Sequence, residues 1–176
     1  MGSTLSVQNG TNDTWSIKVG PDMKALMVST IVLGIVASIG TAGAASGLLA
    51  GMEVAVAGSV ITATTVVGAA DAISVTNVAV DLITHMNESF SQEGYTNVNP
   101  HSEWKSGKKS LSLWQQCEAL RSRRDGDDVI VERLWMRPIF SGPTIDSDNG
   151  HDIQSYINQN GVEEISRIHL VVKTEN

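Results

Sequence analysis

The part of the sequence best suited to chemistry is a basic stretch with two tryptophans between residues 104 and 124. It contains Trp104, Lys105, Lys108, Lys109, Trp114, Arg121, Arg123 and Arg124. At a bilayer interface, Lys and Arg meet lipid phosphates while the indole ring rests at headgroup depth. Each basic residue near an anionic leaflet contributes about 1 kcal/mol to binding. The stretch therefore predicts a lipid-binding surface.

The same charges have an alternative interpretation as a solvated strand edge. Basic side chains on an edge strand discourage pairing with other chains. Three acids, Asp125, Asp127 and Asp128, follow closely enough to pair with the arginines. The sequence alone favours neither interpretation over the other.

The first six residues contain a second candidate signal for membrane binding. They match the N-myristoylation motif, with Gly2 as the acylated residue and Ser6 at the hydroxyl position. The letters MGS are also common in engineered leader sequences, which would make the match meaningless. One myristoyl chain holds a membrane only marginally, so a lipidated Gly2 would need a second membrane signal.

Motifs of catalysis and metal binding do not occur in the sequence. There is no G-x-S-x-G, H-E-x-x-H or C-x-x-C pattern. The run from Gly107 to Ser110 lacks the leading glycine of a phosphate-binding P-loop. The four histidines stand far apart, and Cys117 is expected to be a small core residue. We therefore expect a protein without catalytic activity, metal or cofactor.

The remaining elements must be arranged around a long apolar run, from Ala25 to Ala70, in which Glu53 is the one charged residue. The parts on either side of Glu53 approach the ~20 residues that a helix needs to cross hydrocarbon. Gly43, Gly47 and Gly51 are spaced by four, which would place them on one helical face for close packing. The run predicts a helical hairpin that enters a membrane and oligomerises through these glycines, with Glu53 at the hairpin tip.

Two other interpretations of this run remain open. Ala, Gly, Ser and Thr contribute little to membrane insertion, so the hairpin could instead be the buried core of a soluble domain. The segment from Val54 to Val67 is dense in Val, Ile and Thr, which favours strand over helix. A strand of low charge without proline could assemble between chains.

Composition excludes some classes of function. The net charge of −7 argues against nucleic-acid binding, which relies on Lys and Arg to neutralise phosphates. The single cysteine cannot form an internal disulfide. The first residues have neither the basic nor the apolar region of a signal peptide, so a cytoplasmic, membrane-associated location is expected.

The flanks are expected to be mostly β. Strands are predicted at Thr4–Gln8 and Thr14–Val19 as an N-terminal pair, and at 110–120 and 129–136 as a second pair turning at Asp125-Gly126. A short helix at Asp152–Asn160 and a strand at Ile165–Val172 complete the chain. The predicted fold is α+β, a β-rich framework with a long Gly/Ala-rich helical hairpin inserted. Its segments are 1–22 (strand pair), 23–86 (hairpin), 87–107 (linker) and 108–176 (β-rich, one domain with 1–22).

The expected function is non-enzymatic membrane association, with pore formation or membrane remodelling as its sharpest form. Its partners would be membrane lipid and further copies of the chain. One alternative is a structural protein that self-assembles into a filament or shell through the same apolar run. A second alternative is a lectin-like β module in which Trp104, Trp114 or Trp135 stacks on a carbohydrate.

Overall fold

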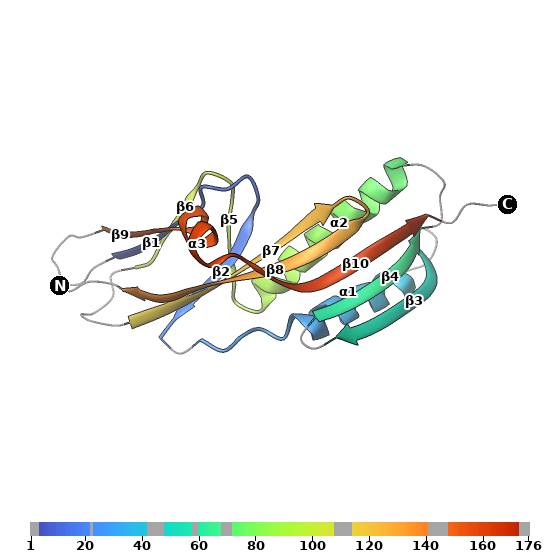
Figure 1. The fold of residues 1–176 in the computed structure, drawn as a ribbon, viewed down its shortest axis with the longest axis horizontal. Coiled ribbons are helices and arrows are strands. Elements are labelled where there is room, and N and C mark those ends of the chain that lie inside the picture. The colour runs from blue at the N-terminus through green and yellow to red at the C-terminus, as the bar shows by residue number, and fades with distance from the viewer. Residues whose placement is uncertain are drawn as a thin grey trace. The chain divides into compact units, whose positions relative to one another are not determined.

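The computed structural model describes residues 4–21, 23–41, 48–57, 60–67, 72–107, 114–140 and 148–172. These residues form three helices and ten strands, so the predicted α+β class is confirmed (Figure 1). The helices are α1 (Val28–Thr41), α2 (Ala72–Gln92) and α3 (Ile153–Asn160). The strands are β1 (Thr4–Gln8), β2 (Trp15–Gly20), β3 (Leu48–Ala57), β4 (Val60–Val67), β5 (Thr96–Val98), β6 (Glu103–Lys105), β7 (Trp114–Asp125), β8 (Asp128–Phe140), β9 (Asp148–Asp152) and β10 (Glu163–Val172).

The chain divides into two compact units. The first contains Met1–Ala25, Phe90–Arg121 and Arg133–Glu163, and the second contains Leu26–Ser89, Ser122–Glu132 and Glu164–Asn176. The long strands β7 and β8 contribute residues to both units. Each unit is therefore assembled from three separate stretches of the sequence.

In the first unit, β1 is the middle strand of a three-stranded sheet, antiparallel to β6 and parallel to β9. Strand β2 is antiparallel to both β5 and β7 in the other sheet. The apolar residues that alternate along β1 and β2, such as Leu5, Val7, Trp15 and Ile17, are buried. With Cys117, Leu134, Met136 and Ile153, among others, they form the core of this unit.

Helix α3 begins and ends where its sequence signals predict. The Asp152 carboxylate accepts a hydrogen bond from the Ser155 amide at 3.0 Å, which caps the helix N-terminus. Gly161 follows the last turn with a φ of 69°, and its amide donates to the carbonyl oxygen of Ile157. A residue with a Cβ is strained at that φ, so glycine suits the position. The prediction of a short helix ended by Gly161 is confirmed.

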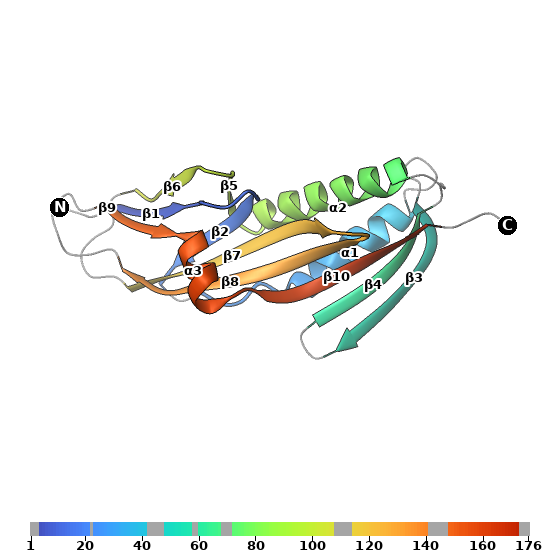
Figure 2. The same ribbon diagram turned by 45° about the horizontal axis from the view of Figure 1, so that its top comes forward.

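In the second unit, β3 is antiparallel to β4, and β4 is parallel to β10. Helix α1 contacts both β3 and β4, and it buries Val28, Val32 and Ile35, which recur at helical spacing. Figure 2 shows the pair β3–β4 beside β10 at the edge of its sheet. We call the pair β3–β4 the apolar ribbon.

The predicted helical hairpin is not confirmed. Helix α1 ends at Thr41, and the residues that were expected to form the rest of the hairpin include the two antiparallel strands of the apolar ribbon. The β-branched side chains of this segment explain the difference, since they lose rotamer freedom in a helix and pack well in strands. Gly51 and Glu53 therefore lie in β3. Because β3 is a strand, a spacing of four residues does not place glycines on a helical face there. Gly43 and Gly47 lie outside the described residues.

The N-terminal strands form as predicted, but the prediction that they pair with each other is wrong. Strand β1 belongs to the three-stranded sheet, whereas β2 lies between β7 and β5. The loop from Asn9 to Thr14 is too long for a tight hairpin turn and makes its own contacts, described below. The predicted pair around Asp125-Gly126 is confirmed as β7 and β8, which are neighbours with Gly126 at a φ of 61° in the turn.

The segment 87–107, expected to be a linker, contains the end of α2 and the strands β5 and β6. None of the helices that the structure describes is long and apolar enough to cross a membrane.

Candidate functional site

Arg121, the first arginine of the predicted lipid-binding stretch, is held by other residues of the first unit. Its Nη1 donates to Oδ2 of Asp13 at 2.9 Å, and its guanidinium lies 4.7 Å from the centre of the Trp15 ring. Only 13% of its side chain is exposed. The Arg121 side chain therefore covers the indole of Trp15 and is not presented to a lipid surface.

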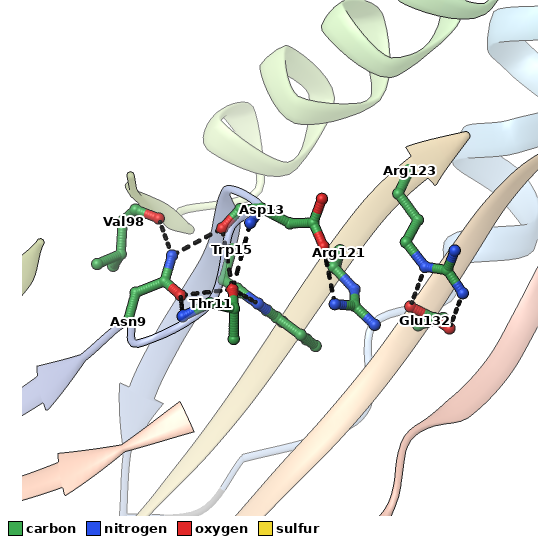
Figure 3. A network of polar contacts seen from close by, with 8 residues as sticks. All are labelled: Asn9, Thr11, Asp13, Trp15, Val98, Arg121, Arg123 and Glu132. Carbon is green, nitrogen blue, oxygen red and sulfur yellow. Dashed lines mark hydrogen bonds and ion pairs between the residues drawn. The ribbon is translucent and has the colours of Figure 1, made fainter. Parts of the chain in front are cut away.

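The next two arginines, in the second unit, also donate to protein groups. Arg123 forms a two-point ion pair with the buried Glu132, with both N–O distances at 3.1 Å (Figure 3). Arg124 donates to the carbonyl oxygen of Gly126 and to Oγ1 of Thr76, each at 2.7 Å. A lipid phosphate would have to compete with these partners.

The other residues predicted to bind lipid either make fewer contacts with protein groups or lie outside the described residues. Lys105 pairs with Glu103 at 3.3 Å, and Trp104 packs half-buried against the core of the first unit. Trp114 is the first residue of β7. Lys108, Lys109 and the predicted lipidation site Gly2 lie outside the described residues.

Asp125 and Asp128, which follow the basic stretch, pair with Arg167 on β10. Their closeness in sequence had suggested pairing with the arginines of that stretch. In the second unit, Arg167 on β10 makes ion pairs with Asp125, Asp128 and Glu164. His169, two residues further along, has Nδ1 at 2.5 Å from Oδ1 of Asp128. Burial raises the pKa of Asp128, but the hydrogen bonds from His169 and Arg167 outweigh it and leave the pKa below its usual value.

A buried polar network holds the loop between β1 and β2 (Figure 3). The amide nitrogen of the Asn9 side chain donates to the carbonyl oxygens of Asp13 and Val98, at 2.8 and 2.9 Å. Its Oδ1 accepts from the hydroxyl of Thr11 at 2.7 Å, and that hydroxyl oxygen accepts from the indole Nε1 of Trp15 at 3.0 Å. The network gives hydrogen-bond partners to the buried polar side chains of Asn9 and Thr11, so its role is structural.

A second buried group, Glu118, lies behind a surface hollow of the first unit that is described below. Glu118 on β7 is fully buried, accepts from the Tyr95 hydroxyl at 2.6 Å and accepts from Nε of Arg133 at 2.6 Å. Burial, and then the hydrogen bond to Glu118, raise the pKa of Tyr95 well above its usual value. Tyr95 is therefore the donor in this pair, and Glu118 fixes the position of Arg133.

Strand β8 presents Arg133, Trp135 and Arg137 on one face, because side chains two residues apart in a strand share a face. The residues between them, Leu134 and Met136, are buried on the other face. The guanidinium carbon of Arg137 lies 3.4 Å from the centre of the Trp135 ring, so the two groups stack. We call these three residues the Arg–Trp–Arg face.

The Arg–Trp–Arg face forms one wall of a hollow of about 380 Å³ in the first unit. The other lining residues run from the last residue of α3 to the first residue of β10, and they are Asn160, Gly161, Val162 and Glu163. From the sequence, Trp135 was a candidate only for stacking on a carbohydrate, and neither Arg133 nor Arg137 was a candidate site residue. The alternation Arg-x-Trp-x-Arg within a predicted strand was the signal that could have identified the face.

The buried cysteine does not have the chemistry of a nucleophile. Cys117 is fully buried in β7, and burial, followed by the negative charge of Glu118, raises its pKa to about 12. Since the thiolate is the reactive form, the thiol is inert at neutral pH. The expectation that Cys117 is a core residue is confirmed. Among the described residues, no group of His, Cys, Asp or Glu is arranged to hold a metal ion.

The backbone register of the apolar ribbon divides its residues into two faces. Val54 is opposite Ala63 and Val56 is opposite Ile61, so these four share a face, which Leu48 and Val67 also join. The other face has Glu53 opposite Thr64 and Ala55 opposite Thr62. By the same alternation Thr65 lies on the first face among apolar residues, whereas the other face contains Glu53, Thr62 and Thr64. The pairing shifts between Leu49 and Glu53, which places an irregularity in β3.

No protein-family model, curated protein or solved structure matches this chain.

Proposed function

We propose that the protein is a non-enzymatic, membrane-associating protein that meets lipid through residues 28–67, which include α1 and the apolar ribbon. The observation that supports the proposal is the two-faced register of the ribbon, within a segment whose one charged residue is Glu53. The apolar segment that the sequence suggested to be a helical hairpin would thus act as one helix and a pair of strands.

The division of the ribbon into faces suits an interface between water and hydrocarbon. Val54, Val56 and Ile61 on one face are residues whose burial in an apolar medium is favourable, by about 1.5–3 kcal/mol for each fully buried side chain. The face with Glu53, Thr62 and Thr64 can keep its polar groups hydrated. A ribbon of this kind can rest in a membrane surface without burying a carboxylate, which is expensive in hydrocarbon.

Assembly would accompany deeper entry into lipid. Among the described strands, β3 has one neighbour, β4, so the backbone groups along its other edge have no strand partner in the sheet. Unpaired backbone groups cost several kcal/mol each in hydrocarbon. A second copy of the chain that pairs along β3 would satisfy them, and pore formation is the sharpest form of this proposal.

The edge of β3 also supports a second candidate function, self-assembly without lipid. The strand is ten residues long and contains no Lys, Arg or Pro. Edge strands usually carry such residues because they prevent pairing between chains. In this candidate, chains would join along β3 in water to form a filament or shell.

The experiment compares two substitutions at adjacent residues of β4, Ile61→Glu on the apolar face and Thr62→Glu on the other face. Flotation with liposomes and release of a trapped dye are measured for both variants and for the parent chain. Circular dichroism and thermal melting establish that each variant is folded. We expect Ile61→Glu to lose flotation and dye release, and Thr62→Glu to retain most of both.

The same samples distinguish the two candidates. Ala55→Lys adds a basic residue to β3 and tests pairing along its edge, while analytical ultracentrifugation without lipid reports the size of the assembly. Large parent assemblies in water that Ala55→Lys disperses, with no flotation of any variant, would favour lipid-free assembly. Equal flotation by folded Ile61→Glu and parent chains would refute membrane association through the ribbon.

A further inference from the structure

We propose that the hollow beside the Arg–Trp–Arg face binds a phosphate group, with Arg137 as its principal ligand. This site lies in the first unit, apart from the apolar ribbon, and does not rest on the proposed membrane function. The phosphate could belong to a lipid headgroup or to a soluble compound, and the two sources are separated by the test below.

Arg137 differs from the arginines of the predicted lipid-binding stretch. Arg121, Arg123 and Arg124 donate to oxygens of the protein, whereas the interaction found for Arg137 among the described residues is its stacking on Trp135. Stacking engages the flat face of the guanidinium and leaves its N–H groups, which lie in the plane, free to donate outward. A planar fork of donors held in place by an aromatic ring is well suited to two-point binding of an oxyanion.

The strand places a second arginine, already paired with an acid, in the same hollow. Arg133 lines it, and the bond to the buried Glu118 fixes the position of its guanidinium. Glu118 in turn is held by the Tyr95 hydroxyl, so the support behind Arg133 is rigid. Because Glu118 balances its charge, Arg133 adds little net positive field, and its role is to hold one side of the hollow in place beside Arg137.

The size of the hollow and the number of donors around it favour phosphate over a simple carboxylate. A carboxylate has two oxygens, which one arginine fork can satisfy, whereas a phosphate monoester presents three oxygens and up to two charges. The hollow also offers the side-chain amide of Asn160 at its rim. Several donors around about 380 Å³ can therefore be used by one phosphate group.

Glu163 provides a converse test, because it lines the same hollow and carries the charge that opposes an anion. Removing that charge should strengthen phosphate binding, while removing the charge of Arg137 should weaken it. A general effect of net charge would produce the same two signs, so the specific site is distinguished by a third substitution, Arg124→Gln, which removes the same charge as Arg137→Gln but in the second unit.

The first arm of the test titrates inorganic phosphate into the full chain and follows the Trp135 indole signal by NMR, assigned with Trp135→Phe. Arg137→Gln should raise the apparent dissociation constant at least about tenfold, the effect of losing one charge-assisted hydrogen bond. Glu163→Gln should lower it. Arg124→Gln, which removes the same charge from the second unit, is the matched control and should leave it unchanged.

The second arm measures flotation with phosphatidylcholine vesicles with and without phosphatidic acid. A component that requires phosphatidic acid and is lost in Arg137→Gln identifies the source as a lipid headgroup. Phosphate binding that depends on Arg137, without any effect of Arg137→Gln on flotation, identifies a soluble phosphate compound. Folded parent protein that shows neither an indole response to phosphate nor flotation that requires phosphatidic acid would overturn the proposal. Arg137→Gln that binds phosphate as the parent does would overturn it as well.

Discussion

The guanidinium of Arg123 and the carboxylate of Glu132 face each other in a two-point ion pair, with Nε to Oε2 and Nη2 to Oε1 both at 3.1 Å. The Glu132 side chain is 6% exposed, whereas the Arg123 side chain is 31% exposed. The carboxylate therefore depends more on its partner than the guanidinium does. Removing the arginine leaves a buried charge with weaker compensation.

We expect Arg123→Ala to lower the free energy of unfolding by about 2 kcal/mol, since it weakens the compensation of the buried Glu132. Arg124→Ala, one residue further along β7, removes an exposed side chain and should cost less than about 1 kcal/mol. Urea denaturation of both variants measures the difference. A cost for Arg124→Ala as large as that for Arg123→Ala would contradict this account of the ion pair.

The network around Asn9 gives a second prediction. Asn9→Ala should lower the free energy of unfolding by about 2–3 kcal/mol, because buried carbonyl oxygens and the Thr11 hydroxyl lose their partner. Asn12→Ala lies in the same loop, but its side chain is exposed and its partner is the exposed His101. We expect its effect to be within about 0.5 kcal/mol.

Urea unfolding of both variants, followed by circular dichroism, measures the difference. If Asn9→Ala were as stable as Asn12→Ala, the network would not be what holds the loop.

The third prediction concerns alkaline pH. Burial and the nearby Glu118 raise the pKa of Cys117 from 9.0 to about 12. The folded protein therefore binds more protons than the unfolded chain between these two pH values, so stability must fall as pH rises through that window. Below pH 9 this contribution is fully present. Tyr95, whose pKa is also raised, acts in the same direction.

Urea midpoints measured from neutral pH to about pH 11 should show this loss, and it should be smaller in Cys117→Ala than in the parent chain. The thiol should react with iodoacetamide only after unfolding, because the reactive thiolate is suppressed in the folded state. Rapid alkylation of the native protein at neutral pH would show that Cys117 is not held as the structure places it.

Most of the flanking elements were predictable because their signals are local. Alternating apolar residues marked β1 and β2, Asp152 and Gly161 marked both ends of α3, and Asp125-Gly126 marked the turn between β7 and β8. The partners of β1 were not predictable from such signals. Pairing with β6 and β9 depends on residues about a hundred positions or more away, and alternation identifies a strand without identifying its neighbour.

The helical hairpin expected in the central apolar run was wrong for a different reason. Low charge and regularly spaced glycines favour a membrane helix, whereas the β-branched residues of Val54–Val67 favour strand, and the strand preference prevails in the structure. The candidate sites show a similar limit. A count of basic residues does not reveal that Arg121 and Arg123 are bound to acids, or that Arg137 is stacked on an aromatic ring, since these differences arise only when strands pair.

The parallel pairing of β4 with β10 has a consequence for biosynthesis. Ile61 is opposite Ser166, and Val67 is opposite Val172. Strand β4 therefore cannot pair with β10 until the residues of β10 have been synthesised and have left the ribosome. Contacts between such distant segments form late, because the entropy of closing the loop must be overcome first. During translation the apolar ribbon is therefore a nascent hairpin without its neighbour in the sheet, and exposed strands of this kind attract chaperones or aggregate. Yield in a cell should consequently depend on how quickly synthesis reaches β10.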